Sequence, residues 1–270
     1  MTKREIILNA DDLGFSAGVN QAVLVAHREG FLTHASLMAN TDFFEEAVSV
    51  ILPQCSGLKV GVHVNLTCAP ALFSENVLTE NGVLRNDFVK LLFKYKSRKV
   101  LESLEKEIEL QILKIKERGI QITHIDGHEH VHIIPSINKI VRKLAAKYKI
   151  PRVREINESF TASFKYNLRT AGISNVLKLF LLKFLSLFNG NSRKVQFYSI
   201  LNTCEINAEN LFNYLENTGD RSVEIMVHPG IPKLDKGLGN LDQRFVSFLQ
   251  SDFRTQELEV CLNNKFSEYF

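Results

Sequence analysis

Short apolar runs alternate with amphipathic segments along almost the whole chain. The runs are mostly aliphatic or β-branched, and several of the segments between them repeat apolar residues at helical spacing. This alternation predicts a parallel sheet whose strands are joined by helices. We expect strands at seven positions: 6–10, 35–39, 59–66, 121–125, 152–156, 195–200 and 223–227.

Seven such units in 270 residues favour a closed or nearly closed barrel, a fold that needs roughly 250 residues. A doubly wound open sheet is the alternative fold. No Pro/Ser-rich linker or shift in composition divides the sequence. We therefore expect residues 1–270 to form a single α/β domain, a catalytic barrel of mostly parallel strands.

Three segments carry helix signals. Residues 42–45 resemble a capping box. Apolar residues between 100 and 115 recur at helical spacing, and Gly119 is expected to close that helix. Pro135 suits the first turn of a helix that runs to about Tyr148.

Charge and cysteine content exclude several classes of protein. The 33 basic residues exceed the 30 acidic ones by only three, which is too small an excess to indicate nucleic-acid binding. The four cysteines are far apart and form no Cys-x-x-Cys pair. Neither a disulfide framework nor a thiolate zinc site fits this pattern, so we expect a reducing compartment, the cytoplasm.

No segment has the length and composition of a signal peptide or a membrane span. The N-terminus has only four or five apolar residues before two aspartates, and the most apolar stretch, 176–188, contains two lysines. We expect 176–188 to be a helix packed on the core or on the partner subunit of a homodimer. A surface that touches a lipid or an apolar substrate is the alternative.

Polar side chains gather where the predicted strands end. In a parallel α/β fold the carboxyl ends of the strands meet at one rim, where ligands bind. Core packing gives no reason for acids, imidazoles and an arginine to collect there. The residues concerned are Asp11, Asp12, His63, Arg154 and His228, with the segment 124–132.

Each of these residues also has an ordinary structural interpretation. Asp11 and Asp12 could cap the next helix, but two adjacent carboxylates cannot both do so. One metal ligand and one base is the division we expect. His63 alone is more typical of a satisfied buried histidine. Arg154 could equally form a surface ion pair with Glu155 or a nearby acid.

The segment 124–132 reads HIDGHEHVH. If the chain stays extended, its alternating histidines and aspartate form one row of donor atoms. Imidazole and carboxylate groups suit zinc and other first-row metals. A catalytic site uses about three protein ligands, so the others would orient ligands or contact substrate. The sequence does not divide these roles among His124, Asp126, His130 and His132.

Four segments resemble a known family. They are NADDLG at 9–14, GVHVNLT at 61–67, HIDGHEHVH at 124–132 and HPG at 228–230. In this order they resemble the YdjC-like carbohydrate deacetylases, which include chitooligosaccharide deacetylase and the hopanoid-associated deacetylase. The resemblance implies a distorted (β/α) barrel and a divalent metal used to remove N-acetyl groups from amino sugars.

Site roles follow from this resemblance position by position. The metal aspartate matches Asp12, and the metal histidines match His63 and His128. Magnesium and zinc are the ions we expect, because an Asp/His₂ set accepts either.

The catalytic groups follow in the same way. The base matches Asp11 and the proton donor matches His228, while Arg154 is expected to hold Asp11 in place. The segment 160–192 matches no family motif, and we expect it to shape the choice of sugar. An oligosaccharide and a glycosylated lipid both fit as the acetylated amino-sugar substrate.

Three other functions remain alternatives. Two histidines and one carboxylate also form the facial triad of non-haem iron oxygenases, although those enzymes usually have antiparallel frameworks. An amidohydrolase or phosphoesterase-like hydrolase is the second alternative, but amidohydrolase barrels tend to open with His-x-His on the first strand. A sugar-binding barrel without turnover is the third.

Overall fold

The structure is a computed structural model that describes residues 4–167, 172–190, 194–235 and 241–270. Seven parallel strands form one curved sheet in the order β7-β6-β3-β2-β1-β9-β8. The strands are β1 Ile6–Leu13, β2 His34–Leu37, β3 Lys59–Val64, β6 Ile122–Gly127, β7 Arg152–Val153, β8 Gln196–Tyr198 and β9 Val223–Val227. All seven predicted strands are confirmed.

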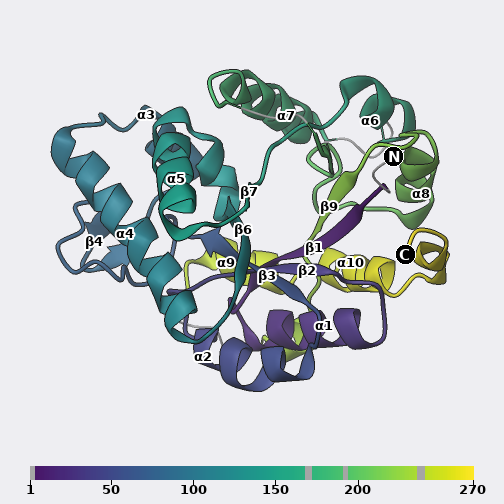
Figure 1. Cartoon of the computed structure of the whole chain (residues 1–270), viewed down its shortest axis with the longest axis horizontal. Coiled ribbons are helices and arrows are strands. Elements are labelled where there is room, and N and C mark those ends of the chain that lie inside the picture. Colours follow the sequence, from purple (N-terminus) through teal and green to yellow (C-terminus); the bar gives the residue numbers. More distant parts are fainter. Residues whose placement is uncertain (1–3, 168–171, 191–193, 236–240) are drawn as a thin grey trace.

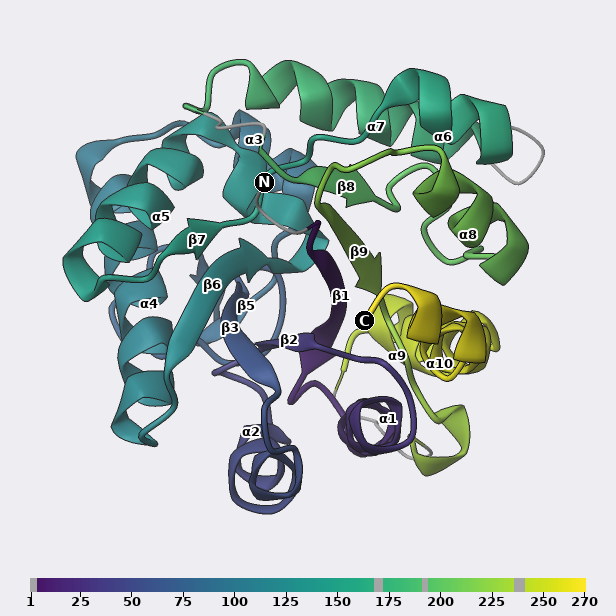
Figure 2. The ribbon, with the colours of Figure 1, turned by 45° about the vertical axis from the view of Figure 1, so that its right-hand side comes forward.

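The strand order is that of a barrel opened along one seam. Successive strands are neighbours from β1 through β7, and β9 returns to the other side of β1. The doubly wound alternative is therefore wrong. The sheet curls into a half-barrel with helices around its outside (Figures 1 and 2). Across the seam, the Phe197 amide donates a 3.3 Å hydrogen bond to the Asn157 carbonyl.

Helices connect the strands and cover the outer face. Their bounds are α1 Ala17–Arg28, α2 Phe44–Glu46, α3 Phe88–Phe93, α4 Arg98–Glu117, α5 Pro135–Tyr148, α6 Phe160–Asn167, α7 Ile173–Ser186, α8 Ala208–Glu216, α9 Gln243–Leu249 and α10 Phe253–Cys261. Short 3₁₀ or π turns are η1 Ala47–Ile51, η2 Leu52–Gln54, η3 His128–Ile133, η4 Pro232–Leu234 and η5 Asn264–Glu268.

The helix predictions are confirmed for α4 and α5. In α4 the apolar residues at helical spacing are buried, and Gly119 follows the helix with a φ of +73° that suits glycine. Helix α5 starts at Pro135 and ends at Tyr148. The capping box at 42–45 is wrong, because α2 begins after Phe43 without a side-chain cap.

A small antiparallel hairpin, β4 Thr79–Glu80 and β5 Val83–Leu84, was not predicted. Its turn is Asn81-Gly82, and both residues have positive φ. Asn-Gly is the favoured pair for a two-residue hairpin turn. The strands themselves are only two residues long, so alternation could not reveal them.

Helix α7 occupies most of the apolar stretch 176–188. One face packs on the core through Leu179, Leu182 and Leu185, while its opposite face is exposed. Among the described residues, no helix has the length and hydropathy needed to traverse a bilayer.

Glu158 is a buried carboxyl between α6 and the end of β8. It accepts hydrogen bonds from Ser163 Oγ (2.7 Å) and from the Ile200 amide (2.6 Å). Burial nevertheless raises the pKa of Glu158 from 4.5 to about 7. The folded protein keeps this proton at a pH where the unfolded chain has released it. The free energy of unfolding should therefore fall as pH rises from about 4.5 to 7.

In Glu158→Gln, the free energy of unfolding should fall by about 3 kcal/mol less over this pH range than in the wild type, because a neutral amide does not titrate. Urea unfolding at a series of pH values across that range measures the effect. The matched control is Glu209→Gln on the exposed face of α8, which should keep the wild-type pH dependence. If the free energy of unfolding of Glu158→Gln depends on pH as that of the wild type does, another group causes the fall in stability.

Candidate active site

The end of β1 brings two consecutive carboxylates to one side of the chain. Successive side chains in a strand point to opposite faces, but Asp12 has a φ of +70° and the pairing register shifts between Ala10 and Leu13. This irregularity breaks the alternation, so both acids take part in the same buried cluster. Neither aspartate caps α1, because Ser16 does so through the Val19 amide (3.2 Å).

Asp12, His63 and His128 meet as predicted. His128 Nδ1 lies 2.9 Å from Asp12 Oδ1, and His63 Nε2 lies 3.4 Å from the same oxygen. All three residues are buried, and they offer ligand atoms within 4.8 Å of one another. Asp12 lies on β1 and His63 on β3, and His128 begins η3 directly after the end of β6.

Asp126 orients His63. Its Oδ1 lies 2.7 Å from His63 Nδ1, which leaves His63 Nε2 directed toward Asp12. A carboxylate on the far nitrogen of a histidine ligand is the usual support in metal sites. Burial opposes the charged ring, but Asp126 and Asp11 raise the pKa of His63 to about 10.

Arg154 is fully buried and binds three carboxylates. Its guanidinium holds both oxygens of Asp11 at 2.7 Å and also contacts Asp126 (2.8 Å) and Glu224 (2.7 Å). The predicted proximity of Arg154 and Asp11 is therefore observed, and the surface pair with Glu155 is wrong. Burial opposes ionisation, but Arg154 above all lowers the pKa of Asp11 to about 2.

The donor set fits a divalent cation better at Asp12 than at a second cluster. The second cluster consists of Asp11, His63 and Asp126, whose ligand atoms also lie within 4.8 Å of one another. There, however, Arg154 contacts both oxygens of Asp11 and Oδ2 of Asp126. At Asp12, by contrast, the buried Nε2 of His128 has no hydrogen-bond partner among the described residues. Leaving a buried polar atom without a hydrogen-bond partner costs free energy. A cation bound by the His128 ring would remove that cost.

His228 lies beyond the end of β9. Its backbone amide donates to Glu257 on α10, and its Nδ1 is 3.4 Å from the same carboxylate. The positive field of His228 contributes to the low pKa of Asp11, which places the two groups in one electrostatic cluster.

The prediction of one extended row over 124–132 is wrong. Strand β6 ends at Gly127, and the chain then turns through η3, where Glu129 and His130 have positive φ. His124 packs against β3, because a Cβ at Gly61 would come within 2.3 Å of its ring.

His130 and His132, which both lie within η3, are buried. No hydrogen bond reaches either ring nitrogen of His132 within the described part of the chain. Burial lowers the pKa of His132 to about 3 and holds that of His130 well below its usual value. Both rings are therefore neutral.

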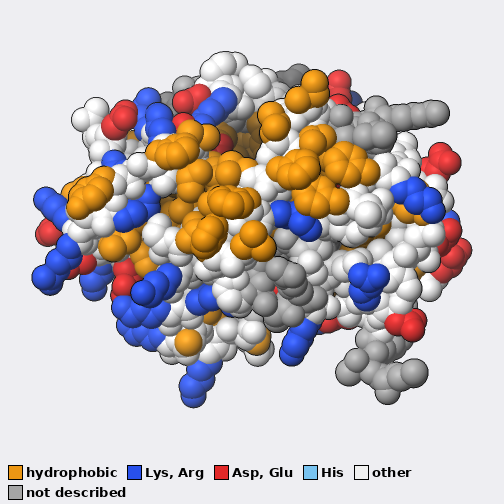
Figure 3. Space-filling view, turned by 90° about the horizontal axis from the view of Figure 1, so that it is seen from above, with side chains coloured by type: hydrophobic (Ala, Val, Ile, Leu, Met, Phe, Trp, Pro, Cys, Tyr) orange, Lys and Arg blue, Asp and Glu red, His pale blue; other side chains and the backbone are white. Residues whose placement is uncertain are grey.

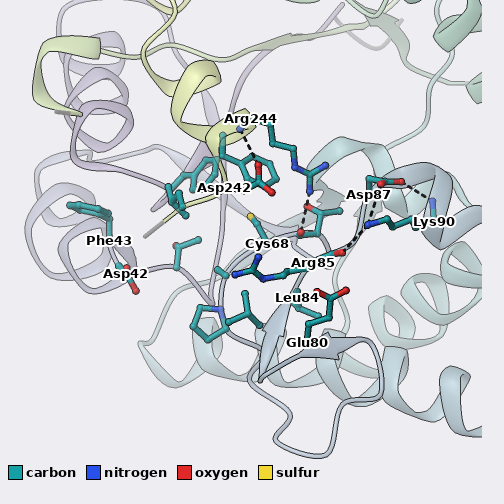
Figure 4. Close-up of a pocket in the computed structure, with 18 residues that line it drawn as sticks. Asp42, Phe43, Cys68, Glu80, Leu84, Arg85, Asp87, Lys90, Asp242 and Arg244 are labelled. Atoms are coloured by element: carbon teal, nitrogen blue, oxygen red, sulfur yellow. Dashed lines mark hydrogen bonds and ion pairs between the residues drawn. The ribbon is translucent and has the colours of Figure 1, made fainter. Parts of the chain in front are cut away.

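A cavity of about 810 Å³ lies next to two aromatic residues that contact the site, although none of Asp12, His63 and His128 lines it. Phe15 and Phe245 line it and also pack against the His128 ring, with centroids 5.5 and 5.7 Å away. Arg85 and Arg244 reach into it from different elements (Figure 4). This volume is within the usual range for small-ligand pockets.

Sequence reasoning missed three charged residues that support the site. Arg254 lies 3.4 Å from Asp12, Glu257 holds His228, and Glu224 pairs with Arg154. Only Glu224 carried a signal, since a charged residue inside the apolar strand VEIMV needs a partner.

Fold and site together define a parallel α/β half-barrel protein with a buried carboxylate–histidine centre at the strand ends. More particularly, the chain belongs to the YdjC-like protein family, whose model matches residues 5–270. The predicted family is therefore confirmed, and so is the distorted barrel that it implies.

Relatives and a solved structure agree with this assignment. A carbohydrate deacetylase of Brevibacillus brevis is 41% identical over 150 residues, which are 54% of this chain and 58% of that protein. That match thus spans little more than half of the relative. A carbohydrate deacetylase of Clostridium beijerinckii is 30% identical over 98% of this chain and 94% of its own. A candidate cellobiose-phosphate cleavage protein from Enterococcus faecalis V583 has the same fold, with a TM-score of 0.68, 22% identity and coverage of 99% and 94%.

Proposed function

We propose that the chain is a metal-dependent carbohydrate N-deacetylase, a hydrolase that cleaves the amide of an acetylated amino sugar. The observation that carries this proposal is the convergence of the buried side chains of Asp12, His63 and His128. A cavity of about 810 Å³ is lined by Phe15 and Phe245, whose rings pack on His128. The carbohydrate deacetylase names of the two relatives support the same reaction. No observation in the site favours the oxygenase, phosphoesterase or binding-protein alternatives.

Asp12, His63 and His128 would hold one divalent ion, with magnesium and zinc as the ions we expect. A bound divalent ion supplies a Lewis acid that polarises a carbonyl and lowers the pKa of water. Asp126 keeps His63 in place for this role through its 2.7 Å contact.

Asp11 would accept the proton of the attacking water. Its low pKa keeps it ionised throughout the neutral range, which a proton acceptor requires. Arg154 and Asn9 fix the carboxylate through hydrogen bonds of 2.7 and 2.8 Å. A carboxylate so stabilised is a weak base, so it would hold the proton only briefly.

His228 would donate a proton to the departing amine. This role requires the imidazolium form before bond cleavage. The Glu257 carboxylate lies 3.4 Å from His228 Nδ1, within range to orient the ring. The proposed acid and base would thus come from the ends of two neighbouring strands, since His228 directly follows β9 and Asp11 lies on β1.

Acetate release tests the proposed reaction. The protein is incubated with a panel of N-acetylated sugars, oligosaccharides and glycolipids, with added zinc or magnesium and with chelator. We expect acetate from at least one substrate and none after chelation. Metal binding with no acetate from any substrate would favour the sugar-binding alternative.

Asp126→Asn is expected to weaken divalent binding by about 10- to 100-fold, because the amide cannot support the His63 ring as a carboxylate does. Titration calorimetry with zinc or magnesium measures the change. Asp252→Asn, an exposed acid at the start of α10, is the matched control and should bind as the wild type does. If Asp126→Asn binds the ion with wild-type affinity, Asp126 does not support the metal site.

The remaining predictions concern the setting of the protein. All four cysteines are free thiols, which supports the cytoplasm as the compartment we propose. One catalytic domain spanning residues 1–270 stays a prediction, as do the two alternatives for 176–188, a homodimer contact and a surface that touches a lipid or an apolar substrate. Size measurement in solution tests the homodimer.

A further inference from the structure

The outer face of α7 is an exposed apolar stripe. Ile173, Leu177, Phe180, Phe184 and Phe188 recur every three or four residues, and their exposed fractions are 82%, 65%, 55%, 57% and 66%. A surface helix normally presents polar residues to water on this face. Helix α7 is thus apolar on both sides, and core packing accounts for only one of them.

A second exposed apolar group lies on and just after α3. Val89, Phe93 and Tyr95 are 57%, 79% and 84% exposed. Both α3 and α7 contact η3, the turn that begins at His128. Figure 3 shows hydrophobic side chains gathered on this face, with lysines, arginines and some acidic side chains around them. We call these two groups the α3–α7 surface, and it borders the candidate active site.

Within the two segments that form this surface all the charged residues are basic, and two of them, Lys90 and Arg98, pair with the adjacent acids Asp87 and Glu102. Residues 88–99 and 172–190 contain no acidic residue, although the whole chain carries 30 of them. The basic residues in these two segments are Lys90, Lys94, Lys96, Arg98, Lys99, Lys178 and Lys183. Surfaces that bind anionic lipid typically combine exposed Phe and Leu side chains with neighbouring lysines. The two segments have this composition, and neither contains an acidic residue.

We propose that the α3–α7 surface docks on a lipid bilayer that contains anionic headgroups. Its apolar side chains would enter the interface, and the exposed Lys94 and Lys99 would lie at the level of the headgroups, whereas Lys183 of α7 turns inward and donates to the Glu158 carbonyl. A second copy of the chain is a poorer occupant, because a two-fold contact through this surface would bring like charges together. Docking would place the active site next to the bilayer. If the proposed deacetylase function holds, an amino sugar carried on a lipid is the substrate class that fits.

Vesicle co-sedimentation tests the docking. The full chain is mixed with vesicles of phosphatidylcholine alone, or of phosphatidylcholine with roughly 30% phosphatidylglycerol. We expect binding to the anionic vesicles and weaker binding at high salt, which screens surface charge. The triple variant Leu177→Ser, Phe180→Ser and Phe184→Ser should reduce the ratio of bound to free protein at least about tenfold.

The control is Val50→Ser with Leu234→Ser, two half-exposed apolar residues outside this surface. This variant should bind as the wild type does. Failure of the wild type to bind anionic vesicles, or equal binding by the triple variant, would overturn the proposal. A wild-type dimer that the triple variant converts to a monomer, without lipid binding, would overturn it in favour of a second copy. The assay needs no turnover, so its failure is distinct from failure of the acetate assay.

Discussion

His63→Ala and His128→Ala are each expected to lose more than about a hundredfold in divalent affinity, and activity with it. Removing a ligand should cost more than the 10- to 100-fold typical of residues that only support one. Calorimetry measures the affinity directly. A thermal shift gives a second readout, since an ion at about a hundred times its Kd stabilises the folded state by about 2.7 kcal/mol.

His27→Ala is the matched control. His27 is half-buried on α1, where its ring contacts the carbonyls of Leu32 and Ser56, away from the site. It should keep full metal affinity and the full thermal shift. Circular dichroism shows whether each variant is folded. A folded His63→Ala protein with wild-type affinity would contradict the assignment of this ligand.

Asp11→Asn and His228→Ala are expected to keep metal and lose turnover. A general acid or base typically contributes between about 10² and 10⁴ in rate. The low pKa of Asp11 makes it a weak base, so its loss should lie toward the lower end of that range. Neither residue belongs to the Asp12 set, so kcat should fall while calorimetry still detects the ion.

Asp220→Asn is the control for the base, because Asp220 is an exposed acid outside the site. It should turn over at the wild-type rate. Turnover by Asp11→Asn at that same rate would remove Asp11 as the base. Loss of metal from Asp11→Asn would instead mean that Arg154, once released from Asp11, displaces the ligands.

The barrel could be predicted because its signal is local and repeated. Seven buried strands need apolar runs, and each run stands out between helical segments. The ligand residues could be predicted because polar side chains directly follow or end those runs, as at Asp12 and His63. Strand ends meet at one rim in any parallel barrel, so sequence position was enough to bring them together.

Backbone conformation could not be predicted in the same way. The positive φ of Asp12 allows two adjacent acids to share one site, but aspartate adopts this conformation only occasionally. The turn at η3 likewise depends on Glu129 and His130 in positive φ, which neither residue signals. An extended chain was the simpler expectation there, and it gave the wrong arrangement for His130 and His132.

Residues that act across the fold carried the weakest signals. Arg254 and Glu257 come from α10, beyond the last motif. They reach Asp12 and His228 because α10 packs on α1 and its Arg254 carbonyl accepts a hydrogen bond from the Gly230 amide, just beyond β9. Their spacing of three places them on one helix face, yet nothing in the helix itself marks that face as functional.

The central claim is that Asp12, His63 and His128 hold one divalent cation. Anomalous X-ray diffraction from crystals grown with excess zinc measures this most directly. We predict one strong anomalous peak within coordination distance of all three side chains. A peak elsewhere, or imidazoles of His63 and His128 turned away from the Asp12 carboxylate with no ion between them, would contradict it.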